Sequence, residues 1–182
     1  MSVFLGFLPH AASADALATL QAAAREGVAA DAPRHAWRTS RQWHMTLAYL
    51  GETLDEAMQA RVVDAIAPVA MQSPSTSLAF HALQYWSGAS VLVAKYAQDA
   101  AFAALHSHAQ AALAALGFVP EKRKPQPHVT LAYLPKGGRV PSQAPGAAAD
   151  VPGFAIDTLH LLATRPGHYA CLHAWPLAGT AP

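Results

Sequence analysis

One eight-residue segment occurs twice in this chain, as HMTLAYLG at 44–51 and as HVTLAYLP at 128–135. Only the second and eighth positions differ, and the copies start 128 − 44 = 84 residues apart in a chain of 182 residues. Both copies are rich in the aromatic and apolar residues of strands, and each follows a segment with helical periodicity. The repeat therefore predicts two equivalent strands in two lobes that are related by a pseudo-twofold axis.

Within each copy, strand geometry places the histidine and the threonine on one face. Alternate side chains of a strand share a face, so His44 lies beside Thr46, and His128 lies beside Thr130. The same alternation places the tyrosine of each copy on the opposite face, in the core: Tyr49 and Tyr133. If the lobes are related by a twofold axis, the two His-x-Thr pairs face each other across one cleft.

Two such pairs suit phosphoryl chemistry. Histidine is the side chain whose ordinary pKa lies near neutral pH, so one neutral imidazole can accept a proton from water while a protonated one donates to the leaving oxygen. The threonine hydroxyls can donate hydrogen bonds to the non-bridging oxygens of the phosphate. Packing alone does not require histidine and threonine at the same places twice, which favours a paired catalytic site over coincidence.

The rest of the chain mixes helical and strand patterns. Strands are predicted for VFLGFL near the N-terminus, for segments on both sides of Ser87–Ala89, and for two segments around RPGH near the C-terminus. Hairpins mixed with three helices favour an α+β fold with mainly antiparallel sheets over a doubly wound fold. We expect one bilobal domain over residues 1–182, with its sheets lining a central cleft.

A few residues are expected to set the ends of the helices. Ser13 is predicted to cap the first helix, and Thr53, with a glutamate three residues later, the second. Pro68 is expected to end the second helix, and Asp99 to cap the third. The Pro- and Gly-rich segment 136–153 is expected to be an irregular connection.

Composition excludes several other classes. Charged residues make up 13% and the formal net charge is +1, so a polyanion would have to meet a local basic cluster. The single cysteine, Cys171, rules out an intrachain disulfide and fits a reducing compartment.

The N-terminus lacks a basic signal-peptide region and no apolar run is long enough to span a bilayer, so we expect a cytoplasmic protein without a membrane partner. His106 and His108 cannot face together on a helix, and no metal or cofactor is expected.

At the repeated motifs the chain resembles the two-histidine (2H) phosphoesterase superfamily, and in particular the bacterial RNA 2′,3′-cyclic phosphodiesterases, also described as LigT-type 2′-5′ RNA ligases. The resemblance extends to VFLGFLP, to WRTSRQWHMTLAYLGE, to LGFVPEKRKPQPHVTLAYL and to FAIDTLHLLATRPGHYACLHAWPL, which together span nearly the whole chain. Many relatives have arginine soon after the second motif, where this chain has Tyr133, and often phenylalanine before it, where this chain has Gln126. These departures leave the nucleotide preference open.

The resemblance implies a bilobal α+β fold with a central cleft, without a metal requirement. It implies hydrolysis of a 2′,3′-cyclic phosphate at an RNA 3′ end to a 2′-phosphate, so the expected partner is RNA or an oligonucleotide with such an end. On this reading His128 is the base that activates water and His44 is the acid that protonates the 3′-oxygen, although the sequence does not decide which histidine plays which part. No obligate protein partner is expected.

Five further residues are predicted to bind substrate. Arg123 and Lys124 belong to the densest basic cluster and are predicted to attract the RNA backbone, with a solvated turn as the alternative. Trp37 is predicted to stack on a nucleobase, with core packing as the alternative. By resemblance Tyr169 lines the cleft, and Arg165 either contacts phosphate or forms a hairpin tip.

Two other functions stay open. The same cleft could act on 2′-5′-linked oligonucleotides, as a phosphodiesterase or ligase, or on a cyclic phosphate of ADP-ribose. A non-catalytic RNA-binding module is the alternative of another class. The presence of both histidines and both threonines argues against the module, because binding alone does not need two proton-transfer groups.

Overall fold

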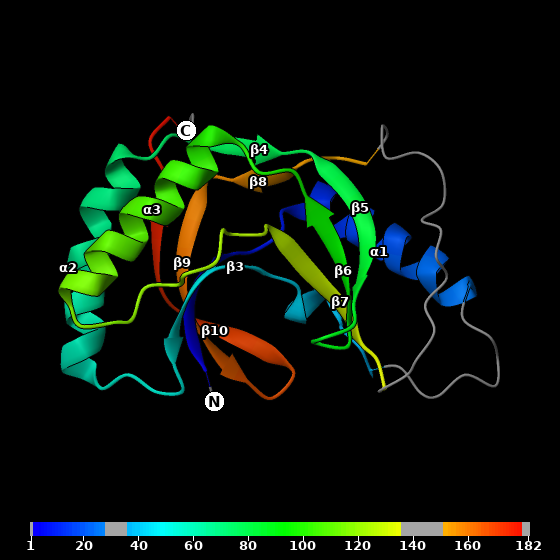
Figure 1. Cartoon of the computed structure of the whole chain (residues 1–182), viewed down its shortest axis with the longest axis horizontal. Coiled ribbons are helices and arrows are strands. Elements are labelled where there is room, and N and C mark those ends of the chain that lie inside the picture. Colours follow the sequence, from blue (N-terminus) through cyan, green and yellow to red (C-terminus); the bar gives the residue numbers. More distant parts are fainter. Residues whose placement is uncertain (1, 28–35, 136–150, 180–182) are drawn as a thin grey trace.

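The computed structural model describes residues 2–27, 36–135 and 151–179, and its centre is an eight-stranded sheet in which neighbouring strands pair antiparallel. The strand order along this sheet is β10 (His168–Pro176), β9 (Thr158–Arg165), β1 (Val3–Phe7), β3 (Met45–Gly51), β7 (His128–Tyr133), β6 (Val91–Tyr96) and β5 (Phe80–Trp86). The short strand β2 (Ala36–Trp37) also pairs with β7, and β4 (Thr76–Leu78) pairs with β8 (Phe154–Ile156) in a second sheet. Together with the helices these sheets confirm the predicted α+β class (Figure 1).

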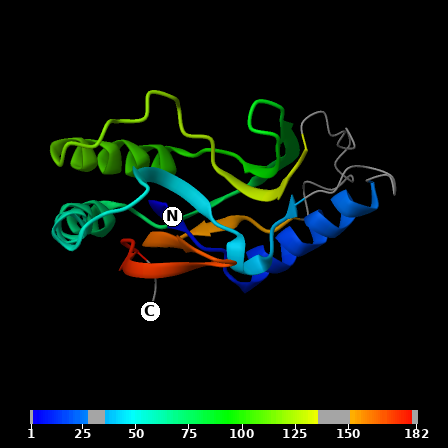
Figure 2. The same cartoon turned by 90° about the horizontal axis from the view of Figure 1, so that it is seen from below.

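Three helices pack on the strands. Helices α2 (Glu56–Gln72) and α3 (Ala100–Ala115) lie together at one end of the molecule, and α1 (Ala11–Glu26) lies at the other end (Figures 1 and 2). Each helix buries an apolar stripe in one core, which also takes the inward side chains of β1, β3, β7 and β9. Among the described residues, no helix has the length and apolar character that a membrane span needs.

The two copies of the repeated segment are the two central strands of the sheet. They meet at the antiparallel pair Met45–Val129, and 129 − 45 = 84 is the spacing of the repeat itself. Each strand has its own outer neighbour: β1 pairs with β3, and β6 pairs with β7. Because the central pair is antiparallel, the residue after Met45 runs beside the residue before Val129. Thr46 of one motif is therefore next to His128 of the other.

Both central strands contain a β-bulge at the same place in the repeat. In β3 the partners of Leu5 and Gly6 are Ala48 and Thr46, which leaves Leu47 as the extra residue. In β7 the equivalent extra residue is Leu131, since Leu92 pairs with Ala132 and Val93 with Thr130. A bulge adds one residue to one strand and shifts the alternation of its faces. The leucine and the alanine after it are consequently both buried in each copy.

The bulges correct the prediction for the repeated tyrosines. Simple alternation places Tyr49 and Tyr133 in the core, but their side chains are 61% and 49% exposed. The extra leucine returns each tyrosine to the face that carries the histidine and the threonine. Strict alternation would also place Ala48 on that face, and this too is wrong because Ala48 is buried in the core.

Both predicted boundaries of α2 are wrong, and the predicted cap of α3 is confirmed. Helix α2 is capped by Asp55, whose side chain accepts from the Met58 amide, and not by Thr53. It also continues past Pro68 to Gln72, because Pro68 lies on the exposed side of the helix, where water can satisfy the carbonyl that loses its partner. Asp99 caps α3 as predicted by accepting from the Phe102 amide.

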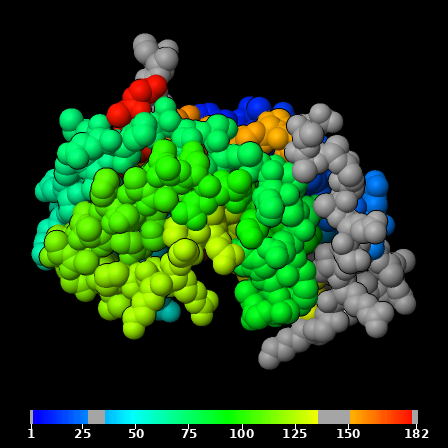
Figure 3. Space-filling view, turned by 45° about the horizontal axis from the view of Figure 1, so that its top comes forward, coloured from blue at the N-terminus to red at the C-terminus, as the bar shows by residue number. Residues whose placement is uncertain are grey.

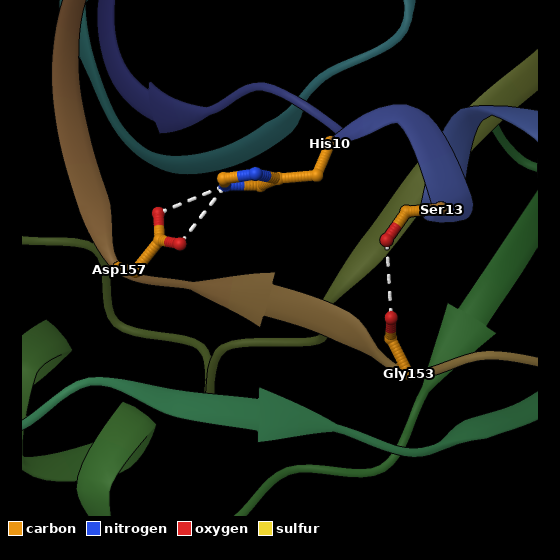
Figure 4. A network of polar contacts seen from close by, with 4 residues as sticks. All are labelled: His10, Ser13, Gly153 and Asp157. Atoms are coloured by element: carbon orange, nitrogen blue, oxygen red, sulfur yellow. Dashed lines mark hydrogen bonds and ion pairs between the residues drawn. The ribbon is translucent and has the colours of Figure 1, made fainter. Parts of the chain in front are cut away.

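Ser13 does not cap α1 but anchors it (Figure 4). It lies inside the first turn, is buried, and its hydroxyl donates to the Gly153 carbonyl at 3.0 Å. His10, the residue before the helix, forms an ion pair with Asp157 at 2.9 Å. These contacts join the start of α1 to both ends of β8, which lies more than 140 residues further along the chain.

A tight approach between β1 and β3 generates a stability prediction at Gly6. A Cβ added there would lie 2.6 Å from the Met45 carbonyl oxygen and 3.4 Å from the ring of Phe4. Because backbone atoms cannot move aside as a flexible side chain can, we expect Gly6→Ala to lower the free energy of unfolding by roughly 1–3 kcal/mol. Thermal denaturation followed by circular dichroism measures the effect.

The matched control is Gly88→Ala, since a Cβ at Gly88 would have no atom within 4 Å. This variant should unfold within a few degrees of the unchanged protein. Equal melting temperatures for the two variants would show that the close contact at Gly6 does not constrain the sheet.

Candidate active site

The two histidines are held in the same way. His44 Nδ1 donates to the Gln42 carbonyl at 3.2 Å, and His128 Nδ1 donates to the Gln126 carbonyl at 2.7 Å. Because a carbonyl can only accept, Nδ1 must carry the hydrogen, and Nε2 of a neutral ring then presents a lone pair. Both imidazoles are thus oriented to exchange a proton through Nε2.

The structure also extends the repeat. The partners of the two histidines are glutamines, and 126 − 42 = 84, so Gln-x-His-x-Thr-Leu-Ala-Tyr-Leu is the full repeated pattern. The bond to histidine uses the main-chain carbonyl, which any residue could supply. The side chain of Gln42 has another role, since its Oε1 accepts from the Thr39 amide at 3.0 Å.

Burial favours the neutral form of both imidazoles. The pKa of His44 is lowered to about 4 in total: burial is the largest cause, the Gln42 carbonyl opposes it, and the positive charges of Arg38 and His128 add to it. Burial also lowers the pKa of His128, although the hydrogen bond to the Gln126 carbonyl acts in the opposite direction and raises it. In the free protein at neutral pH, His44 is therefore a base without a proton, ready to accept one.

Aromatic rings surround each histidine. The ring centroid of His44 lies 4.8 Å from that of Phe4 and 4.6 Å from that of Tyr169. The ring of His128 lies 4.4 Å from that of Trp86. Trp86 comes from the last position of β5, 42 residues before His128, and nothing in the sequence around the motifs pointed to it. These rings desolvate the imidazoles and hold them in place.

A cleft lies on the His128 side of the pair, with a volume of about 1210 Å³. Figure 3 shows the surface hollowed between the β5–β6 hairpin and the segment that precedes β7. Thr46, Tyr49, Trp86 and His128 form its inner wall, and residues 118–126 form much of its rim. Small-molecule sites commonly have volumes of several hundred cubic ångströms, so this one has room for a nucleotide.

The predicted basic residues lie on the rim. Arg123 and Lys124 are exposed and line the cleft together with Lys122. Arg165 is at the tip of the β9–β10 hairpin, where it pairs with His168 and donates to the Thr164 carbonyl at 3.2 Å. The structure therefore brings the 122–124 cluster to the cleft that His128 lines, whereas Arg165 lies at a hairpin tip.

The two predicted aromatic residues lie in different places. Tyr169 contacts His44, as described above, and its hydroxyl donates to the Gln42 carbonyl at 3.3 Å. Trp37 pairs with Ala132 and packs in a small cluster beneath α1, with the Arg25 guanidinium 4.9 Å from its ring. Because its pairing partner Ala132 is fully buried, Trp37 lies on the buried face of β7, away from the histidines.

Arg38, the residue after Trp37, was not among the predicted site residues. Its Nη2 donates to the Tyr169 hydroxyl at 2.9 Å, and its guanidinium lies 5.6 Å from the centre of the Tyr133 ring. The sequence showed Arg38 as one of several arginines before the first motif. Only the pairing of β2 with β7 shows that it faces the site.

Within the described ranges, no three His, Cys, Asp or Glu side chains lie close enough together to hold a metal ion. His106 is buried and lines the cleft, and burial lowers its pKa. His108, two residues further along α3, is exposed. His106 and His108 therefore face different sides of α3, as the helical spacing predicted.

Solved structures share this architecture. The crystal structure of TT0787 of Thermus thermophilus superposes with a TM-score of 0.78 at 20% sequence identity and covers 100% of both chains. The structure of Escherichia coli LigT complexed with 3′-AMP superposes with a TM-score of 0.72 at 19% identity over 97% of both chains. The same protein complexed with NADP⁺ superposes with a TM-score of 0.72 at 18% identity, over 97% of this chain and 96% of LigT. At these identities the likeness shows the fold.

The family is shown by the sequence. No curated protein sequence matches the chain. Residues 9–167, however, match the family described as the 2′-5′ RNA ligase superfamily, and this match includes both His-x-Thr motifs. The chain belongs to the 2′-5′ RNA ligase superfamily of two-histidine phosphoesterases.

Proposed function

We propose that this protein is a phosphodiesterase that opens a 2′,3′-cyclic phosphate at an RNA 3′ end to a 2′-phosphate, without a metal ion. The observation that carries the proposal is the matched pair of imidazoles on two paired strands, both with Nδ1 bound to a carbonyl and Nε2 directed away from that bond. Such a pair supplies one base and one acid, which is what the opening of a phosphodiester by water requires.

In the proposed reaction His44 Nε2 accepts a proton from the attacking water. The water oxygen bonds to phosphorus, the bond from phosphorus to the 3′-oxygen breaks, and His128 donates a proton to that oxygen. Thr46 and Thr130 donate hydrogen bonds to the non-bridging oxygens, where charge builds up. The sum is one water consumed and one 2′-phosphate formed, after which the two imidazoles exchange protons with solvent.

This assignment reverses the one drawn from the family resemblance, in which His128 was the base. The reason is the pKa of His44 of about 4, which leaves this imidazole neutral at working pH. A base must be unprotonated when substrate binds, and His44 meets that condition. The acid role falls to His128, which must bind its proton despite burial, and an anionic phosphate beside it favours that protonated form.

RNA is the substrate class that the rim supports best. The exposed basic segment 122–124 borders the cleft, and a polyanion gains affinity from such a cluster. Trp86 and Tyr49 line the same wall and offer flat surfaces for bases. E. coli LigT, which has this fold, has been crystallised with 3′-AMP, a nucleotide.

The first test is hydrolysis of a 2′,3′-cyclic-ended oligonucleotide in the presence of EDTA. We expect a 2′-phosphate product, and we expect His44→Ala and His128→Ala each to lower kcat by roughly 10²- to 10⁴-fold, because each removes one proton-transfer group. The exposed His108→Ala is the matched control and should keep full activity. Full activity in either cleft variant, or a 3′-phosphate product, would refute the mechanism.

The same assay on 2′-5′-linked oligonucleotides and on ADP-ribose cyclic phosphate separates the alternative substrates. The RNA end should give the highest kcat/KM. Tight RNA binding without turnover of any substrate would instead identify a binding module.

The roles of acid and base are separated by a substrate whose leaving group needs no proton. Thymidine 3′-(4-nitrophenyl phosphate) releases 4-nitrophenolate, and it lacks the 2′-hydroxyl that could replace water. We expect His128→Ala to lose far less activity on this ester than on the cyclic phosphate, whereas His44→Ala should lose similar activity on both. The opposite pattern would show that His128 is the base.

The lowered pKa values also predict the pH dependence of kcat/KM. Protonation of His44 as the pH falls through about 4 removes the base. Loss of the proton from His128 as the pH rises past its lowered pKa removes the acid. We therefore expect a bell-shaped profile with its maximum below pH 6.5, the ordinary pKa of histidine, measured with the cyclic-ended oligonucleotide while circular dichroism monitors folding. A plateau that extends unchanged to about pH 8 would contradict a requirement for one protonated imidazole.

A further inference from the structure

We propose that Arg38 is the phosphate-binding cation of the two-histidine site, held beside His44 by Tyr169 so that its guanidinium contacts a non-bridging oxygen of the substrate. The inference rests on the proposed phosphodiesterase function and adds a residue that neither motif contains. Four features of the structure carry it: the anchoring of the backbone, the contacts of the side chain, the charge around it and the chemistry of the guanidinium.

The backbone of Arg38 is fixed to the second motif strand. Its amide donates to the Leu131 carbonyl at 2.8 Å, and its own carbonyl accepts from Gln21 Nε2 at 2.8 Å. The buried Gln21 amide also donates to the Leu131 carbonyl, at 3.0 Å. One side-chain amide from α1 thus joins Arg38 to the bulged residue of β7. Since Trp37 takes the buried side of β7, Arg38 takes the other side, where the histidines lie.

Two tyrosines position the guanidinium. Tyr169 accepts a hydrogen bond from Arg38 at 2.9 Å while its own hydroxyl donates to the Gln42 carbonyl, which also holds His44. Burial raises the pKa of Tyr169, so its phenol stays neutral and keeps both bonds. On the other side the guanidinium lies over the Tyr133 ring, within the distance of a cation–π contact. Within the described part of the chain, these aromatic and hydroxyl groups, and no carboxylate, hold the charge.

An anion is the partner that this arrangement would accept. Among residues 2–27, 36–135 and 151–179, no carboxylate forms a recorded ion pair with Arg38. The bond to Tyr169 uses one of the five N–H donors of the guanidinium. The charge acts on the catalytic pair, since it is one of the causes that lower the pKa of His44. A phosphate beside His44 would accept from a planar fork that matches its geometry.

The test compares Arg38→Gln and Arg38→Lys with the unchanged protein. We expect Arg38→Gln to lower kcat/KM on the cyclic-ended oligonucleotide by roughly 10²- to 10³-fold, the size expected when one donor to the developing charge is removed. Arg38→Lys keeps the charge but loses the planar fork, so its kcat/KM should lie between those of Arg38→Gln and the unchanged protein. The matched control is Arg25→Gln, which also removes an arginine from an aromatic ring but lies outside the cleft and should keep full activity.

A binding measurement separates phosphate contact from a merely structural role. Titration calorimetry with adenosine 2′-phosphate, the form of the proposed product, should show at least tenfold weaker binding to Arg38→Gln, whereas binding of adenosine should be unchanged. The acidic limb of the kcat/KM profile should also move to higher pH in this variant, because Arg38 no longer opposes protonation of His44. Unchanged affinity for adenosine 2′-phosphate would overturn the proposal even if activity fell.

The role of Arg38 and the phosphodiesterase function are refuted by different outcomes. If His44→Ala and His128→Ala are inactive but the kcat/KM of Arg38→Gln stays within threefold of the unchanged protein, the role of Arg38 is refuted. The proposed phosphodiesterase function is then still supported. If the histidine variants are fully active, the proposed function itself is refuted.

Discussion

The site depends on one antiparallel contact, the pair Met45–Val129 between the two central strands. Both residues occupy the middle position of a His-x-Thr motif, so a single pair of backbone segments brings two imidazoles and two hydroxyls together. A pair at any other register would separate them, because a shift by one residue moves every side chain to the other face. The bulges at Leu47 and Leu131 then keep the Leu-Ala of each copy in the core and return the tyrosines to the face that carries the histidines.

The chemistry follows from how these imidazoles are held. A carbonyl two residues upstream sets the tautomer of each ring, and aromatic neighbours remove water from it. Desolvation disfavours the charged form, which is why both pKa values fall and why an anionic substrate is needed to stabilise a protonated histidine. Arg38 contributes to the same balance in two ways, since it opposes protonation of His44 in the empty site and attracts the anion that reverses the effect.

The parts of the fold and of the candidate site that depend on local sequence patterns could be predicted from the sequence. The repeat predicted two equivalent strands, the hairpin around Ser87–Ala89 formed as expected, and Asp99 capped α3. The prediction for Tyr49 and Tyr133 was wrong because the bulge depends on the register with β1 and β6, which strand periodicity does not contain. The clue was present in both copies, since two consecutive small or apolar residues follow each His-x-Thr. Trp86 and Arg38 were missed because they reach the histidines only through strand pairing.

The sequence by itself determined the α+β class, the two central strands and the residues able to carry protons, because these depend on periodicity and on a repeat that packing alone does not require. The tertiary structure decided which side chains surround the histidines. It placed Trp37 against α1 and Arg38 against Tyr169, although the two are adjacent in the chain, since the pairing of β2 with β7 sets which of them faces the core. It also set the pKa of His44, which depends on burial and on the charges of Arg38 and of the distant His128, which the fold brings near it.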